Sequence, residues 1–138
     1  MNPLQAFRPR RRGRQRFVVV GGGLAASRAV MSIRKAGHEG PITMIGEERS
    51  LPYDRPPLSK DVLVGAVGVA SAQLHPREWY DDLDVDLRLG QAAIDLDLQR
   101  RRLTLADGDT VPWDRLLLAT GSAVRRLFVP GADLANIL

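Results

Sequence analysis

FVVVGGGLAAS, residues 17–27, decides the fold of this 138-residue chain. Phe17 to Val20 are aromatic and β-branched, which predicts a short buried strand. Three glycines end that strand, and apolar residues then recur with helical spacing from Leu24 to Ala36. ITMIG, residues 42–46, predicts a second buried strand. A strand–helix–strand unit of about thirty residues makes its two strands parallel, with a right-handed crossover.

The glycine turn between the strand and the helix fits the pattern G-x-G-x-x-G/A through Gly21, Gly23 and Ala26. Gly21 permits a tight turn, Gly23 lets the backbone approach a pyrophosphate, and Ala26 lets the helix pack closely on the strand. The start of the helix offers unpaired N–H groups to phosphates. Glu47, at the end of the second strand, can accept hydrogen bonds from ribose hydroxyls. Glu48 is the weaker candidate because it lies further into the next loop.

The rest of the chain predicts short elements around a small antiparallel meander. Short helices are expected at LSKDVLVG (58–65) and HPREWYDDL (75–83), with a small apolar loop over 65–72. Further strands are expected at 85–90, 92–97, 102–107, 110–114 and 115–121. The last of these, RLLLATG, is apolar enough to rejoin the parallel sheet. The sequence therefore predicts an α/β, Rossmann-like fold with a parallel sheet and an inserted antiparallel β-meander.

The glycine fingerprint is common to FAD-binding and NAD(P)-binding proteins. Three features favour FAD in this chain. The fingerprint comes early, a meander follows the first strands in place of another strand–helix unit, and an ATG tripeptide ends the strand after the meander. A fortuitous glycine turn beside an exposed acid is the alternative interpretation.

Composition and hydropathy exclude several classes of protein and site. The chain has no cysteine, which excludes a disulfide scaffold, a cysteine-ligated metal site and a redox dithiol, and fits a cytoplasmic protein. No run approaches the ~18 apolar residues of a membrane span, so we expect no membrane partner. The sequence predicts no metal ligands.

Six arginines lie within the first 16 residues, which leaves 14 basic and 16 acidic residues for the rest of the chain. We expect residues 1–15 to form a disordered basic tail and residues 16–138 to form the folded domain. A nucleic-acid or membrane-binding arm is the alternative for the tail. No aromatic residue is interleaved with the arginines, so nucleic-acid binding is not our expectation.

Seven motifs occur in order along the chain: GGGLAA, MIGEE, LPYDRPPLSK, REWY, TLADG, WDRLLLATG and VPGADL. In them, the chain resembles the N-terminal FAD-binding segment of ferredoxin, rubredoxin and putidaredoxin reductases. These flavoproteins belong to the pyridine nucleotide–disulfide oxidoreductase superfamily, here without its redox cysteines. The resemblance covers about residues 16–138, and LPYDRPPLSK is its most specific motif. It implies FAD as the cofactor.

The resemblance also implies roles for individual residues. The FAD pyrophosphate would be bound by Gly21, Gly23, Leu24 and Ala25, and Ala26 completes the cofactor-binding fingerprint. The remaining contacts would come from Glu47 at the adenosine ribose, Arg55, the backbone of Ala93 at the adenine, and Ala119, Thr120 and Gly121. Lys60 would lie beside the isoalloxazine ring. A fixed ammonium there stabilises the reduced flavin and shifts its potential, whereas a solvated helix lysine is the alternative for Lys60.

The reductases that this chain resembles transfer a hydride from NAD(P)H to FAD. They then pass electrons singly to an iron–sulfur protein such as ferredoxin or rubredoxin. Their chains continue into an NAD(P)H-binding domain and a C-terminal domain, neither of which is present here. We therefore expect an incomplete FAD-binding domain, which is inactive by itself because NAD(P)H binds only to the complete enzyme. The alternatives are a catalytically inactive dinucleotide-binding remnant, or the FAD module of a related NADH oxidase or nitrite reductase-like protein.

Overall fold

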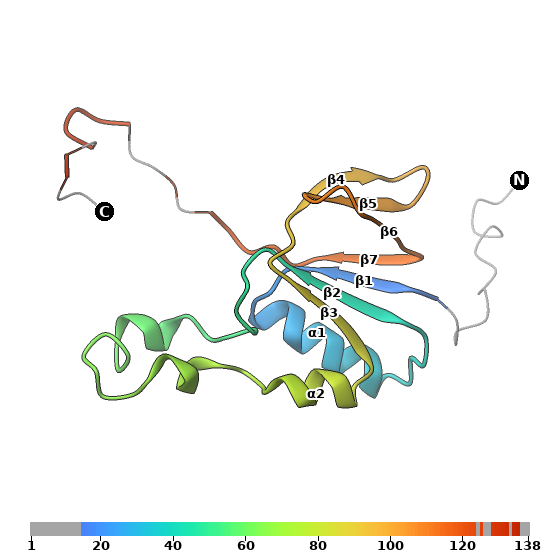
Figure 1. The fold of residues 1–138 in the computed structure, drawn as a ribbon, viewed down its shortest axis with the longest axis horizontal. Helices are drawn as coiled ribbons and strands as arrows, with labels where there is room; N and C mark the ends of the chain where they lie inside the picture. The colour runs from blue at the N-terminus through green and yellow to red at the C-terminus, as the bar shows by residue number, and fades with distance from the viewer. Residues whose placement is uncertain (1–14, 124, 126–127, 133, 136–138) are drawn as a thin grey trace, which may run out of the picture.

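The computed structural model describes residues 15–123, 125, 128–132 and 134–135. At its centre lies a four-stranded parallel sheet in the order β3-β2-β1-β7 (Figure 1). Its strands are β1 (Phe17–Val20), β2 (Ile42–Gly46), β3 (Val85–Leu89) and β7 (Arg115–Leu118). A three-stranded antiparallel meander precedes β7 in the chain and comprises β4 (Ala93–Asp97), β5 (Arg102–Leu105) and β6 (Thr110–Pro112). The predicted parallel sheet with an inserted meander is confirmed.

The two faces of the parallel sheet bury two separate apolar clusters. Helices α1 (Leu24–Lys35) and α2 (Arg77–Asp82) cover one face, and the meander covers the other (Figure 1). Alternate residues of a strand point to opposite faces. Val19 therefore packs with the helix-side cluster, and Val18 and Val20 pack with the meander. Burial on both faces is the reason why β1 is apolar at every position.

Residues 54–72, called the arm below, differ from expectation. The helix predicted over 58–65 is wrong, because a short 3₁₀ helix, η2 (Pro56–Ser59), is followed only by turns. The predicted loop over 65–72 instead contains a second 3₁₀ helix, η3 (Val69–Ala72). Gly65 takes a positive φ of 73°, which ends any helix begun by the prolines. The basic tail predicted over 1–15 lies outside the described residues except for Gln15.

Arg34, near the end of α1, connects this helix to two loops. Its guanidinium donates hydrogen bonds to four backbone carbonyls, those of His38, Gly40, Leu83 and Asp84, at 2.7–2.8 Å. The side chain is 13% exposed. From the sequence, Arg34 was only a cation favourable to the helix C-terminus. In the structure it supplies the donors for carbonyls of both the α1–β2 and α2–β3 connections.

Arg34→Met should lower the free energy of unfolding by about 2–4 kcal/mol, because it leaves partly buried carbonyls without their charged donor. Urea denaturation followed by circular dichroism measures the change. Arg28→Met is the matched control on the same helix, since the Arg28 side chain is exposed and has no partner among the described residues. The control should change stability by less than about 0.5 kcal/mol, and an equal loss in both variants would contradict this role for Arg34.

Asp114 holds the start of β1 beside the start of β7. Its carboxylate accepts hydrogen bonds from the Arg16 side chain at 3.0 Å and from the Arg16 backbone N–H at 2.9 Å. These bonds hold the pKa of Asp114 below its ordinary value. A carboxyl group whose pKa is lowered by folding stabilises the native state fully above about pH 4. That contribution is lost as the pH falls through the folded-state pKa.

Asp114→Asn should therefore reduce stability at pH 6 and make the loss of stability between pH 5 and about pH 2.5 shallower. Urea midpoints measured across this range provide the test. Asp61→Asn serves as the control, because the Asp61 side chain is exposed in the arm and has no partner among the described residues. If the urea midpoint of Asp114→Asn fell between pH 5 and about pH 2.5 as steeply as that of the unmodified chain, the Arg16–Asp114 contact would not form in solution.

Candidate functional site

The glycine turn lies at the carboxyl end of β1, where the order of the sheet reverses. The chain runs from β1 outward to β2 and β3 on one side, and returns with β7 on the other side. Ligands of open α/β sheets bind outside the strand ends at such a switch point. Gly21 N–H donates to the Ile45 carbonyl at 2.7 Å, and Ala119 N–H donates to the Val20 carbonyl at 2.7 Å. The turn is thus held between the ends of β2 and β7.

Gly21 is required by the backbone geometry of this turn. Its φ is 137°, and a Cβ built at this position would lie 2.1 Å from the carbonyl oxygen of Ala119. No L-side chain fits there without displacing backbone. Gly21, the first fingerprint glycine, therefore packs directly against Ala119, the first residue of the ATG tripeptide. The sequence did not predict this contact.

The N-terminus of α1 presents N–H groups that no side chain caps. Gly23 is its N-cap residue, without a side-chain hydrogen bond, and the first turn contains no acidic residue. A Cβ at Gly23 would have no protein atom within 4 Å, so the space in front of it is open. Ala26 is fully buried against the sheet, as close packing of helix and strand requires. Leu24 and Ala25 are exposed at the same helix start. This geometry fits a pyrophosphate.

The two acids after β2 differ in their surroundings. Glu48 accepts hydrogen bonds from the Tyr53 hydroxyl at 2.7 Å and from Arg55 at 2.9 Å. The hydrogen bond to Glu48 raises the pKa of Tyr53. Glu47 is exposed and has no hydrogen bond or ion pair among the described residues. Its carboxylate is therefore available to a ligand, whereas Glu48 organises the LPYDR loop.

Two further glycines shape the site and were not singled out from the sequence. Gly46 leaves no room for a side chain beside the turn, since a Cβ at Gly46 would lie 3.3 Å from the Gly22 Cα. Gln91 N–H donates to the Gly46 carbonyl at 2.9 Å, and Gly90 N–H donates to the Glu48 carbonyl at 3.0 Å. These bonds bring the segment that leads into Ala93 beside the end of β2. The sequence signal for this packing is a glycine at the end of β2, Gly46, and one directly after β3, Gly90.

The other predicted residues lie at the same end of the sheet with differing constraints. Ala119 is half-buried against the turn, and Thr120 and Gly121 are exposed directly after β7. Lys60 is exposed at the end of η2 and has no side-chain partner among the described residues. Arg55 is paired with Glu48, so its predicted cofactor contact would have to share the guanidinium with that acid.

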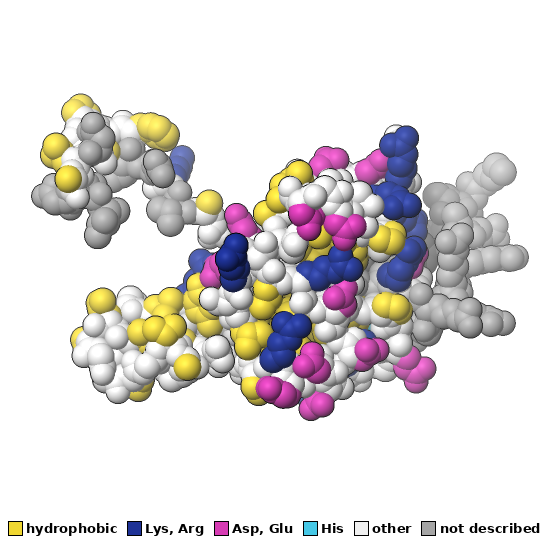
Figure 2. All heavy atoms as spheres, viewed as in Figure 1, with side chains coloured by type: hydrophobic (Ala, Val, Ile, Leu, Met, Phe, Trp, Pro, Cys, Tyr) yellow, Lys and Arg dark blue, Asp and Glu magenta, His cyan; other side chains and the backbone are white. Residues whose placement is uncertain are grey.

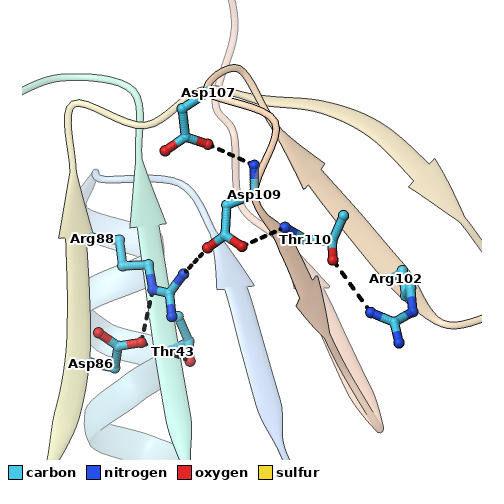
Figure 3. A network of polar contacts seen from close by, with 7 residues as sticks. All are labelled: Thr43, Asp86, Arg88, Arg102, Asp107, Asp109 and Thr110. Atoms are coloured by element: carbon cyan, nitrogen blue, oxygen red, sulfur yellow. Dashed lines mark hydrogen bonds and ion pairs between the residues drawn. The ribbon is translucent and has the colours of Figure 1, made fainter.

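A cavity of about 400 Å³ lies beside β3 and the meander. Its polar lining consists of Arg49, Arg77, Arg88, Gln91, Asp107 and Asp109. Arg88 bridges β3 and the meander, with hydrogen bonds of 2.9 Å to Asp86 and to Asp109 (Figure 3). None of the residues predicted to bind the dinucleotide lines this cavity. The Arg88 network therefore connects β3 to the turn between β5 and β6.

The described part of the chain lacks the features of two other kinds of site. It contains no group of three or more His, Cys, Asp or Glu side chains that could hold a metal ion. Within the same residues, no helix has the length and hydropathy needed to cross a membrane.

Curated relatives and solved structures agree with this geometry. The chain is 46% identical over 109 residues to the anthranilate 1,2-dioxygenase system ferredoxin–NAD(+) reductase component of Burkholderia cepacia. It is 38% identical over 120 residues to the benzene 1,2-dioxygenase system ferredoxin–NAD(+) reductase subunit of Pseudomonas putida. These matches cover 79% and 87% of this chain, but the chain spans only 27% and 29% of the two relatives.

The structure of a covalent putidaredoxin reductase–putidaredoxin complex superimposes with a TM-score of 0.81 at 33% identity. That match covers 86% of this chain and 28% of the solved chain. The family model described as pyridine nucleotide-disulphide oxidoreductase matches residues 15–138. The glycine turn, the parallel sheet and the inserted meander are thus shared with this group, and the chain belongs to the pyridine nucleotide–disulphide oxidoreductase family.

Proposed function

We propose that this chain binds FAD as the FAD-binding part of a cytoplasmic, NAD(P)H-dependent oxidoreductase that passes electrons to an iron–sulfur protein. One observation carries the proposal: the uncapped start of α1 and the unpartnered Glu47 lie at the same switch point of the sheet. The names of the relatives, ferredoxin–NAD(+) reductase components, support the type of reaction. The sequence contains a single dinucleotide fingerprint, so this chain would supply only the FAD-binding part.

Each proposed residue acts on a different part of the cofactor. The backbone of the turn and of Leu24 and Ala25 would donate hydrogen bonds to the pyrophosphate, and buried Ala26 would hold the helix start close to the strand. Glu47 accepts hydrogen bonds from the adenosine ribose, and the Ala93 backbone contacts the adenine. Arg55 would contact the cofactor from the base of the arm, and Ala119, Thr120 and Gly121 would contact it from the end of β7. Bound FAD supplies the capacity to accept a hydride from NAD(P)H and to release single electrons.

Titration of the purified chain with FAD tests the proposal. We expect saturable binding, seen as flavin absorbance that remains with the protein after gel filtration. A chain that stays colourless in excess FAD would refute FAD binding and favour the inactive-remnant alternative. We also expect no NADH- or NADPH-driven reduction of a ferredoxin by this chain alone. Rapid turnover would show that the chain holds more than the FAD-binding part.

Lys60→Met should lower the midpoint potential of the bound flavin, because a nearby ammonium stabilises the negative charge gained on reduction. A contribution of about 1.4 kcal/mol corresponds to about 30 mV for a two-electron couple. Potentiometric titration of the FAD-loaded chain measures the shift, and Lys60→Arg should restore most of it. An unchanged potential in Lys60→Met would place this ammonium away from the flavin ring.

A further inference from the structure

The arm, residues 54–72, is closed on itself where it leaves the body of the protein. Asp54 N–H donates to the Ala72 carbonyl at 2.8 Å, and Tyr53 and Gln73 form an isolated antiparallel bridge beside this bond. From this base the arm extends outward from the sheet (Figure 1). The backbone pairing joins the two ends of the arm to each other, so the direction of the arm relative to the parallel sheet depends on its contacts with the body.

The charges of the arm are confined to the half that begins at its base. Its charged residues are Asp54, Arg55, Lys60 and Asp61, and no Asp, Glu, Lys or Arg follows until Arg77. The projecting lobe in Figure 2 is accordingly apolar and uncharged toward its tip. An ionic contact that fixes the arm on the body must therefore involve its base.

Glu48 provides the acceptor for such a contact. One oxygen of its carboxylate, Oε2, accepts a hydrogen bond from the Tyr53 hydroxyl at 2.7 Å, and Oε1 accepts one from Arg55 at 2.9 Å. The Glu48 carbonyl accepts another from the Gly90 N–H at 3.0 Å. Glu48 is thus fixed at the ends of β2 and β3, and its side chain holds the first residues of the arm there.

The segment from Arg55 to Lys60 connects this contact to the Lys60 ammonium. Arg55 is the N-cap residue of η2 and Lys60 is its C-cap residue. The Arg55 carbonyl accepts a hydrogen bond from Leu58 N–H at 3.0 Å, and Lys60 N–H donates to the Pro57 carbonyl at 3.1 Å. At about 2 Å of rise per residue, Lys60 lies about 10 Å along the segment from Arg55, so a rotation of about 20° at Arg55 would displace Lys60 by about 3 Å.

We propose that Glu48 is a positioning residue, which holds the base of the arm against the end of β2 and so sets where the Lys60 ammonium lies beside the cofactor site. The Arg55 and Glu48 side chains are 68% and 48% exposed, so their ion pair adds little to the free energy of folding and acts on position. The Arg55 guanidinium has five N–H donors, so it can bind Glu48 and the cofactor together. The consequence for the flavin rests on the proposed function.

Distances between two spin labels test the positioning in the chain without FAD. The sequence has no cysteine, so Val64→Cys on the arm and Ile94→Cys on the meander, 76% and 63% exposed, place the labels. Glu48→Ala should broaden the distance distribution measured by pulsed electron paramagnetic resonance by at least about 3 Å. Glu48→Gln, which keeps an acceptor oxygen, should restore most of the original width. Glu47→Ala is the matched control, because Glu47 has no side-chain partner among the described residues.

The midpoint potential of the FAD-loaded chain tests the consequence for the flavin. Glu48→Ala and Glu48→Gln remove the same charge, and loss of an anion near the flavin would by itself raise the potential equally in both. Displacement of the Lys60 ammonium lowers the potential. We therefore expect a lower potential in Glu48→Ala than in Glu48→Gln. This difference should vanish when both variants also carry Lys60→Met, because Glu48 acts through Lys60.

The results that would overturn the inference differ from those that would overturn FAD binding. An unchanged label distance in Glu48→Ala, or equal broadening in Glu47→Ala, would show that Glu48 does not fix the arm. A potential difference that persists in the Lys60→Met chains would show that Glu48 does not act through Lys60. A chain that binds no FAD would refute the proposed function, and the label distances would then decide the inference by themselves.

Discussion

Gly21→Ala should destabilise the chain by at least about 3 kcal/mol, a large part of the 5–15 kcal/mol typical of a domain. Two costs combine at this position. Alanine is strained at a φ of 137°, and its Cβ would lie 2.1 Å from the Ala119 carbonyl oxygen. Relief requires the end of β7 to move away from the turn, which breaks the hydrogen bond from Ala119 to Val20. The urea midpoint should fall by at least about 1 M.

Gly22→Ala is the control for this prediction, because it lies next to Gly21 in the same turn. A Cβ at Gly22 would meet the Gly46 Cα at 3.5 Å, which is ordinary van der Waals contact. The φ of Gly22 is also not positive, so alanine is not strained there. The control should therefore cost much less than Gly21→Ala. If both variants unfolded at the same urea concentration, the contact between the turn and β7 would not be the reason for the first fingerprint glycine.

The elements that sequence reasoning predicted well are those with local signals. The continuous apolar run of β1 is explained by its burial on both faces, and Pro76 directly precedes α2. The turn at Asp107 and Gly108 connects β5 and β6 as the dipeptide predicts. In each case, the information lies within a few residues of the element. The parallel pairing of β1 with β2 and β7 then follows from connection rules.

The contacts that sequence reasoning missed join residues far apart in the chain. Arg34 bonds carbonyls about fifty residues later, and Gly21 meets Ala119. Nothing in the local pattern distinguishes Arg34 from any other cation in a last helical turn. The arm was mispredicted for a related reason. Pro57 near the start of the segment suggested a helix, but Leu63 and Val64 are exposed, so burial does not stabilise one, and Gly65 favours a turn.

Gly23→Val should abolish FAD binding while leaving the fold intact, which separates the ligand role of the turn from its structural role. A side chain at Gly23 meets no protein atom within 4 Å, and its extended backbone, with φ −101° and ψ −171°, suits valine. Stability should therefore change by no more than about 1 kcal/mol. The valine side chain would occupy the open space that the pyrophosphate needs, so affinity for FAD should fall at least about 100-fold.

Gly68→Val provides a matched control for the ligand effect. Gly68 is also the N-cap of a helix, η3, with extended backbone and no protein atom within 4 Å of a built Cβ. It lies in the arm, outside the proposed cofactor contacts, so this variant should bind FAD as the unmodified chain does. Fluorescence titration of FAD and urea denaturation of both variants complete the comparison. Unchanged FAD affinity in Gly23→Val would show that the turn is not part of the cofactor site. This would hold even if Gly21→Ala destabilised the chain as expected. Gly21 is required by the neighbouring protein backbone, whereas Gly23 is required only by the proposed ligand.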